Sequence, residues 1–385
     1  MKPLEGVRVL ELGAFITAPL CGMMLANLGA DVIKVENPKT GDSFRAFRGK
    51  HYSPRFAAYN RGKRSIAVDL ATDAGHATVM ALAKRSDVLI ENFRPDVMPR
   101  LGLAWDAVHE ANPKLIYCSI TGFGADGPFA ARPAFDAVGL AMSGIAALFL
   151  DPSNPELMGP TITDNVTGMF ACYGILGALY ERERSGVGRR VEVNMLESSI
   201  AFMPDAFANA LMGGGVMERL TRVAASQSYA FSCSDGKLLA IQLSTQEKFW
   251  TDLLGAIERP ELALDSRFSS RDARVANYVE LRALLRDVFV TRSRSEWFAR
   301  LERCDVPFAP VHALTDVVAD EQVAHLGTFY SVRHPDEGDL TLIHNPVRID
   351  SGRVDAELPP PTLGEHTAEI LHELTDEGYC ATPKI

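Results

Sequence analysis

The sequence predicts an α/β fold: an open, Rossmann-like parallel sheet in a large domain, followed by a smaller α+β domain. Two observations lead to this prediction. Strand-like and helix-like patterns alternate through the first two hundred residues, and a second set of such patterns begins beyond Gly213-Gly214-Gly215. A strand, a helix and a strand within about thirty residues form a βαβ unit, whose strands pair in parallel. The length of 385 residues fits about two domains.

The large domain is expected to contain most of the regular elements. In chain order these are the strands 6–12, 31–36, 65–70, 87–93, 114–120 and 189–195, and the helices 18–28, 73–85 and 164–184. The first helix has clear boundary signals. Thr17 can cap it, Pro19 lies in its first turn, and Gly29 follows its end.

The remainder of the chain is expected to form the second domain and then to return to the first. Its elements are the strands 235–243 and 306–311, helices near 245–257, 276–290 and 294–303, and a last helix from Glu365. We therefore predict a large domain of residues 1–204 completed by 330–385, a linker at 205–228, and a small domain at 229–329.

The composition excludes several classes of protein. A net charge of −10 argues against nonspecific binding to nucleic acid or to an anionic membrane. No run of 18 apolar residues and no apolar signal core are present, which predicts a cytoplasmic protein without membrane partners. The six cysteines are scattered without a C-x-x-C pair, so we expect free thiols and no metal site.

A literal G-x-G-x-x-G occurs after the fifth predicted strand, at residues 122–127. In a dinucleotide site the third glycine opens a helix that meets a pyrophosphate. Here Pro128 follows at once, Pro133 comes soon after, and no strand ending in an acid follows at the right distance. A glycine-rich loop is the better interpretation.

Basic residues gather around two of the predicted strands, which is unusual in an acidic chain. They are Arg55, Arg61, Lys63, Arg64, Arg94 and Arg100. Ligands of open α/β sheets bind at strand ends, and guanidinium groups match phosphates. Two interpretations stay open: a phosphate site, or a solvated surface with ion pairs.

Two aspartates are candidates for chemistry. Asp164 lies where a polar loop passes into a helix, so its carboxylate is either an N-cap or a nucleophile that a substrate can approach. At a helix start we expect it to stay ionised. Asp136 either supports Asp164 or caps a helix of its own. The chain lacks G-x-S-x-G, H-E-x-x-H and any clustered His/Cys set.

At these residues the sequence resembles the family III CoA-transferases, the group that includes formyl-CoA and carnitine CoA-transferases. The similarity runs over nearly the whole chain. Its markers are Leu4–Glu11, Leu28–Glu36, Gly41-Asp42, Asn60–Ile66, Glu91–Phe93 with Arg100, Gly122–Gly124 with Gly127-Pro128, Asp164 with Gly168, and Leu363–Thr367.

The resemblance implies roles for individual residues. Asp164 matches the catalytic aspartate, with Asp136 supporting it. The positions expected to contact coenzyme A are Ile16, Val68, Asp69, Leu70, Ala71, Asn92, Phe93, Arg94, Arg100 and Phe135. Ala71 stands where the family often has a lysine. Ile16 stands where formyl-CoA transferases have a glutamine, which argues against formyl-CoA and oxalate as substrates.

The resemblance also implies an activity and an assembly. CoA would move from an acyl-CoA donor, such as succinyl-CoA, to a free carboxylic acid through aspartyl anhydride and aspartyl-CoA intermediates, with no tightly bound cofactor. The family forms an interlocked homodimer, each subunit a ring of two domains threaded through its partner. The alternatives are an α-methylacyl-CoA racemase, whose histidine base is replaced here by Phe135, and a non-catalytic CoA-binding protein.

Overall fold

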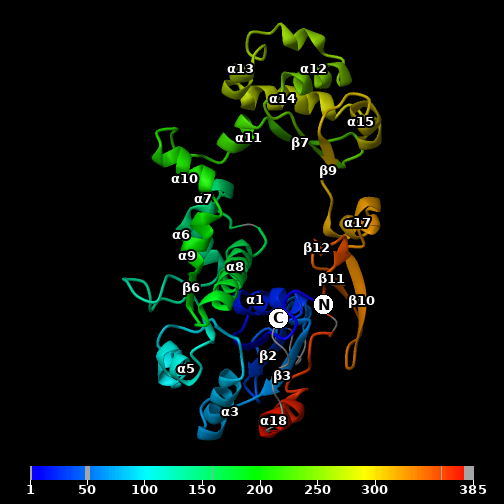
Figure 1. Ribbon diagram of the computed structural model, residues 1–385. Helices are drawn as coiled ribbons and strands as arrows, with labels where there is room; N and C mark the ends of the chain where they lie inside the picture. The colour runs from blue at the N-terminus through cyan, green and yellow to red at the C-terminus, as the bar shows by residue number, and fades with distance from the viewer. Residues whose placement is uncertain (1, 48–52, 158, 357, 377–385) are drawn as a thin grey trace. The chain divides into compact units, whose positions relative to one another are not determined.

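The computed structural model describes residues 2–47, 53–157, 159–356 and 358–376 (Figure 1). The chain divides into two compact units. The first comprises Met1–Ala146, Leu157–Pro204 and Gly327–Ile385, and the second comprises Ala147–Glu156 and Asp205–Leu326. The domain limits given by the sequence stay a prediction.

A six-stranded parallel sheet organises the first unit and confirms the predicted fold class. Its strands are β1 (Arg8–Leu12), β2 (Asp31–Glu36), β3 (Lys63–Ala67), β4 (Val88–Glu91), β5 (Ile116–Thr121) and β6 (Arg190–Asn194). They lie in the order β3-β2-β1-β4-β5-β6. The chain therefore winds outward in one direction from β1 and in the other from β4, and the pair β1–β4 is the topological switch point.

Helices cover this sheet. They are α1 (Thr17–Asn27), α2 (Pro54–Asn60), α3 (Asp73–Lys84), α4 (Val97–Arg100), α5 (Trp105–Ala111), α6 (Asp136–Ser143), α8 (Ile162–Ser185), α9 (Met195–Ala201) and α18 (Thr367–Thr375). Helix α7 (Ile145–Phe149) crosses the boundary of the units. In Figure 1 the red C-terminal helix α18 lies beside the blue strand β3, which it contacts.

Successive residues of the strands contribute side chains to two separate cores, because side chains alternate between the two faces of a sheet. Val9 packs with Leu25 of α1 and Ile175 of α8, whereas its neighbour Leu10 packs with Val79 of α3. Coverage of both faces buries most residues of β1 to β5, charged ones such as Glu11 and Lys34 included, whereas the edge strand β6 is partly exposed.

The predicted cap of the first helix is wrong. Helix α1 begins with Thr17 itself, its N-cap is Ile16, and no side chain caps it. The Thr17 side chain is committed to Asn92 in the loop after β4 instead. A contact with a distant loop thus replaces the local one that the sequence suggested.

Small β-hairpins complete the first unit: β10 (Phe329–His334) with β11 (Gly338–Ile343), and β12 (Arg348–Ile349) with β13 (Gly352–Arg353).

The second unit contains an antiparallel sheet of order β7-β8-β9, formed by Ser228–Ser232, Leu238–Gln242 and Phe308–Pro310. Its helices are α10 (Pro204–Leu211), α11 (Thr221–Ala225), α12 (Glu247–Ala256), α13 (Arg271–Ala276), α14 (Tyr278–Phe289), α15 (Arg294–Leu301), α16 (Leu314–Val318) and α17 (Glu321–Leu326), with a 3-10 helix at Pro260–Ala263. Trp250, Phe289 and Trp297 are central to its core. Helices α10 and α11 lie in the segment expected to be a linker.

Five cysteines of the described chain are free thiols, and Cys380 lies outside the described residues. Within the same residues, no helix combines the length and the apolar character that crossing a bilayer would need.

Candidate active site

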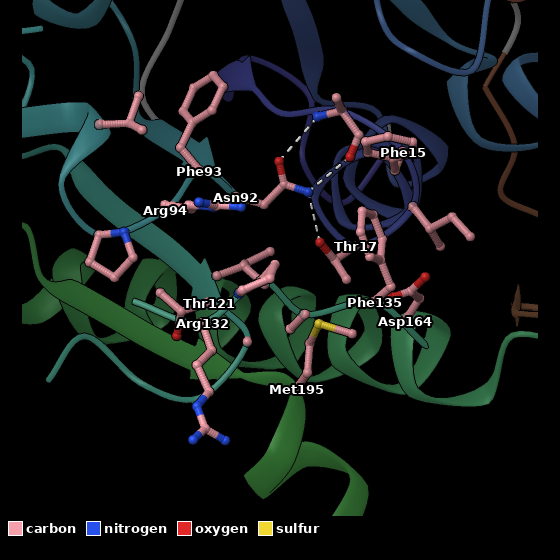
Figure 2. A pocket seen from close by; sticks show the side chains of 18 of the residues that line it. Phe15, Thr17, Asn92, Phe93, Arg94, Thr121, Arg132, Phe135, Asp164 and Met195 are labelled. Atoms are coloured by element: carbon pink, nitrogen blue, oxygen red, sulfur yellow. Dashed lines mark hydrogen bonds between the residues drawn. The ribbon is translucent and has the colours of Figure 1, made fainter. Parts of the chain in front are cut away.

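A cavity of about 490 Å³ lies at the carboxyl ends of β1, β4 and β5, which places it at the topological switch point (Figure 2). Its walls come from the loops that follow these strands and from the starts of α8 and α9. Its lining side chains include Phe15, Ile16, Thr17, Asn92, Phe93, Arg94, Thr121, Arg132, Phe135, Asp164 and Met195.

Asp164 is half-buried in the wall of this cavity. Helix α8 begins at Ile162 after the N-cap Thr161, so Asp164 is the third helical residue and the N-cap interpretation is wrong. Burial, reinforced by the charge of Asp136, raises the pKa of Asp164 from 3.8 to about 7. Burial therefore disfavours the ionised form of Asp164, which opposes the expected effect of the helix start.

Asp136 supports Asp164 through the backbone. It is the first residue of α6, and its Oδ1 accepts a hydrogen bond from the backbone N–H of Asp164 at 3.1 Å. Burial raises the pKa of Asp136, whereas backbone hydrogen bonds from Asp164 and Thr163 lower it. Asp136 is not among the residues that line the cavity, so it acts on the helix start and on the charge of Asp164.

Aromatic side chains form an apolar wall close to Asp164. The ring of Phe15 meets Phe135 edge-on, with centroids 5.8 Å apart, and meets Phe44 in the same way at 5.3 Å. Phe15 has a φ of +64°, a conformation that bulky residues rarely adopt. Its backbone N–H donates to Asp42 Oδ1 at 3.2 Å, which helps to hold this conformation.

Asn92 holds the loop after β1 in place. Its Oδ1 accepts from the backbone N–H of Ala14 at 3.1 Å, and its Nδ2 donates to Ala14 O at 2.9 Å and to Thr17 Oγ1 at 2.8 Å. The dashed lines in Figure 2 trace these bonds. The amide is fully committed within the protein, so Asn92 shapes the cavity through its neighbours.

The predicted stretch Val68–Ala71 lines a second cavity, of about 420 Å³, at the ends of β1, β2 and β3. The two cavities have Ala14, Ser43, Phe93 and Val97 in common. The fold thus gathers Ile16, Asn92, Phe93, Arg94, Phe135 and Asp164 around the first cavity, and Val68, Asp69, Leu70, Ala71 and Phe93 around the second.

The candidate arginines differ in their surroundings. Arg94 lines the first cavity and forms no ion pair with any residue that the structure describes. Arg100 lines neither cavity; its side chain is 71% exposed and pairs with Asp96 at 3.1 Å. Sequence reasoning missed Arg132, which lines the first cavity and stacks on Phe129 at 3.9 Å. Its position between the glycine-rich loop and Phe135-Asp136 is the signal that could have revealed it.

Comparison with known proteins gives the family of the chain. Residues 4–367 match the model of CoA-transferase family III. The chain belongs to CoA-transferase family III. This CoA-transferase is 35% identical to succinyl-CoA:glutarate CoA-transferase of Mus musculus, over 98% of the chain and 88% of the relative. It is 34% identical to succinyl-CoA–D-citramalate CoA-transferase of Chloroflexus aurantiacus, over 97% and 94%.

A crystal structure of a CAIB/BAIF family protein from Brucella suis has the same fold. The TM-score is 0.86 at 33% sequence identity, with 97% of this chain and 99% of the Brucella chain covered. The CoA-transferase is therefore an enzyme of the transferase class.

The glycine-rich loop of the CoA-transferase is not a dinucleotide fingerprint. No helix opens at Gly127, and α6 begins only at Asp136. Gly122 serves close packing instead, since a Cβ there would lie 2.3 Å from Ala134 Cβ. The loop thereby brings the segment 130–135 against the end of β5, where it forms part of the cavity.

A phosphate site is not formed by Arg61, Lys63 and Arg64 in this CoA-transferase. Lys63 is fully buried, with its Nζ 2.8 Å from Glu11 Oε2, and Arg64 pairs with Asp31 at 2.7 Å. Arg61 is also buried. Lys63 and Arg64 begin their strand, whereas the cavities lie where strands end, so the parallel sheet separates them from the site.

Proposed function

We propose that this CoA-transferase carries CoA from succinyl-CoA to a short dicarboxylic acid, with Asp164 as the nucleophile. The position of the Asp164 carboxyl in the wall of a strand-end cavity is the observation that carries this proposal. The relatives named above act on succinyl-CoA and on glutarate or D-citramalate, which supports the choice of donor and acceptor.

The first half of the reaction releases succinate. An Asp164 carboxylate oxygen attacks the thioester carbonyl carbon, the C–S bond breaks, and CoA thiolate leaves a mixed aspartyl–succinyl anhydride. The thiolate then attacks the Asp164 carbonyl carbon, and succinate departs with the electrons of the C–O bond. The product is an aspartyl-CoA thioester.

The acceptor repeats these steps in reverse order. Its carboxylate attacks the aspartyl-CoA carbonyl and expels the thiolate, which then attacks the acceptor carbonyl of the new anhydride. Asp164 regains its carboxylate, and no net proton is gained or lost.

The raised pKa of Asp164 suits this chemistry. A carboxylate of pKa near 4 is a poor nucleophile against a thiolate of pKa about 8.5. A pKa of about 7 brings the basicity of the Asp164 carboxylate closer to that of the thiolate and still leaves roughly half of the group ionised at neutral pH.

CoA binds as a substrate in this proposal, and no tightly bound cofactor takes part. Val68, Asp69, Leu70 and Ala71 would receive one part of the CoA molecule in the second cavity, and Phe93 would lie between the two cavities. Arg94, Arg100 and Arg132 supply positive charge for its phosphates. Contacts to the remote nucleotide hold the thioester in attack geometry and so lower the barrier.

No observation favours the two alternatives. A racemase needs a base on either side of the α-carbon, and the Phe135 ring carries none. A protein that only binds CoA would gain nothing from burying the Asp164 carboxyl group, because such burial costs stability.

We also propose an interlocked homodimer in the cytoplasm, as in the family, with the domain limits given by the sequence. Large apolar side chains on the outer face of α8 support an assembly. Met169, Tyr173 and Tyr180 are exposed at spacings of four and seven residues, and Tyr173 is 76% exposed. Such a stripe is typical of a surface that another chain covers.

Trapping of the covalent intermediate tests the proposal. Incubation with succinyl-CoA followed by borohydride or hydroxylamine should modify Asp164, as read by peptide mass spectrometry. Asp164→Ala should abolish both modification and transfer while CoA still binds, whereas Asp272→Ala, at a 98% exposed aspartate, should behave as the wild type. Near-normal turnover of Asp164→Ala would refute the assignment.

A further inference from the structure

Thr17 is a buried polar residue at the cavity for which the proposed reaction has as yet no use. Only 6% of its surface is exposed, yet it lines the same cavity as Asp164. In Figure 2 it lies with Asn92 on one side and Asp164 on the other.

The hydroxyl of Thr17 has a defined orientation. Its oxygen accepts the hydrogen bond from Asn92 Nδ2 at 2.8 Å, so its own proton cannot point toward Asn92. Among the described residues no group accepts that proton. A buried hydroxyl normally uses its donor, which leaves a bound molecule in the cavity as its partner.

The helix does not need this hydroxyl. Threonine at a helix start usually caps free backbone N–H groups, but the N-cap of α1 is Ile16 and no side chain caps the helix. The side chain is therefore held at the cavity by Asn92 and not by a capping role.

Helix packing brings Thr17 to the Asp164 side of the cavity. A Cβ on Gly168 would come within 2.8 Å of the backbone oxygen of Thr17, so α1 and α8 lie in close contact there. Asp164 precedes Gly168 by four residues and shares its face of α8.

We propose that Thr17 is a catalytic hydrogen-bond donor to the reacting carbonyl oxygen. The inference rests on the proposed function. When the Asp164 oxygen bonds to the thioester carbon, the C=O electron pair moves to oxygen, and the Thr17 O–H donates a hydrogen bond to that oxyanion. The proton stays on Thr17. The pair then re-forms C=O as the C–S bond breaks and thiolate leaves.

The same donor serves the first and the last tetrahedral intermediates, in which the attacked carbon belongs to the acyl group of the donor or the acceptor; in the two intermediates between them the attacked carbon belongs to Asp164. A fixed donor that costs no reorganisation at the moment of reaction stabilises the transition state more than the ground state. Thr17 should therefore affect the rate of chemistry and leave the binding of free CoA, which has no carbonyl at this position, nearly unchanged.

Three variants test the inference. Thr17→Val removes the hydroxyl at constant shape, and Thr17→Ser restores it. The control Thr78→Val removes a hydroxyl from α3, where Thr78 donates to Ala74 O at 2.8 Å. Single-turnover formation of the covalent adduct from succinyl-CoA is measured by intact mass, with CoA affinity by calorimetry and folding by thermal melting. We expect Thr17→Val to slow adduct formation about 100-fold at unchanged CoA affinity, and Thr17→Ser to recover most of the rate.

The outcomes separate this inference from the proposed function. Adduct formation by Thr17→Val at the wild-type rate would overturn the role of Thr17 alone. An equal loss in Thr17→Val and Thr17→Ser, or a loss of CoA affinity in Thr17→Val, would show that Thr17 only shapes the loop. Failure of the wild type itself to form an adduct would remove the proposed function.

Discussion

The backbone N–H of Asp164 donates to the Asp136 carboxylate across 3.1 Å, so one aspartate fixes the helix start that presents the other. The same contact places two negative charges close together. Asp136 therefore contributes to raising the pKa of Asp164 while it holds the backbone of Asp164 in place.

Transfer should depend on pH through Asp164. With its pKa at about 7, kcat/KM should rise as pH rises through about 7 and should fall roughly tenfold per unit well below it, because only the carboxylate is nucleophilic. A pH profile with succinyl-CoA at subsaturating concentration checks this. A flat profile from pH 5 to 8 would contradict the ionisation assigned to Asp164.

Asp136→Asn should move that profile toward acid. The new amide oxygen still accepts from the backbone of Asp164, but the negative charge that helps to raise the pKa of Asp164 is gone. We expect the midpoint to shift down by up to about one unit, with the plateau rate reduced less than in Asp136→Ala, which also loses the acceptor at a cost of about 1 kcal/mol of stability. An upward shift would show that the two aspartates do not interact as described.

Asp164→Asn should stabilise the protein at alkaline pH. The folded pKa lies above the unfolded value of 3.8, so the folded chain holds this proton between about pH 4 and 7 when the unfolded chain has lost it. The free energy of unfolding of the wild type therefore falls across that window. Partial exposure limits the gain in the variant to about 1 kcal/mol at pH 8, with little difference near pH 4. Thermal melting of the variant and the wild type at both pH values measures this difference in stability.

Lys34→Met should destabilise the fold strongly. Lys34 is fully buried, and its Nζ lies 2.8 Å from Glu11 Oε1 and 2.9 Å from Asp42 Oδ2. Removing the ammonium leaves the buried Asp42 carboxylate without its ion-pair partner and leaves Glu11 with Lys63 alone, at a cost of about 3–5 kcal/mol in denaturant unfolding. Arg100→Met breaks an exposed pair and should cost under about 1 kcal/mol. Equal losses in the two variants would contradict the burial argument.

Arg94→Ala should weaken binding of CoA substrates. Its charge faces the cavity without an ion pair among the described residues, and losing one charge-assisted contact should raise KM about tenfold with a smaller effect on kcat. Arg100→Ala should have a weaker effect, because Arg100 is exposed and paired with Asp96. KM measured at low and high salt tests both. A larger effect at Arg100 would reverse the proposed order.

Local patterns were enough to predict the α/β sheet. Apolar stretches such as 88–90 and 115–118, separated by helical periods, indicate parallel strands because strands buried on both faces need no polar alternation. The motif around Asp164, taken with its family resemblance, was also readable without coordinates. Such features depend on neighbours in the sequence, so the sequence by itself determined them.

The tertiary structure decided how those segments meet. Strand direction put Lys63 and Arg64 at the edge opposite the cavities, and strand order brought Asn92 onto the loop of Thr17. Packing of α6 against α8 joined Asp136 to Asp164, 28 residues apart. No local rule predicts these contacts. Two polar groups that are distant in the sequence become partners only when the order of the strands is set and the helices pack on the sheet.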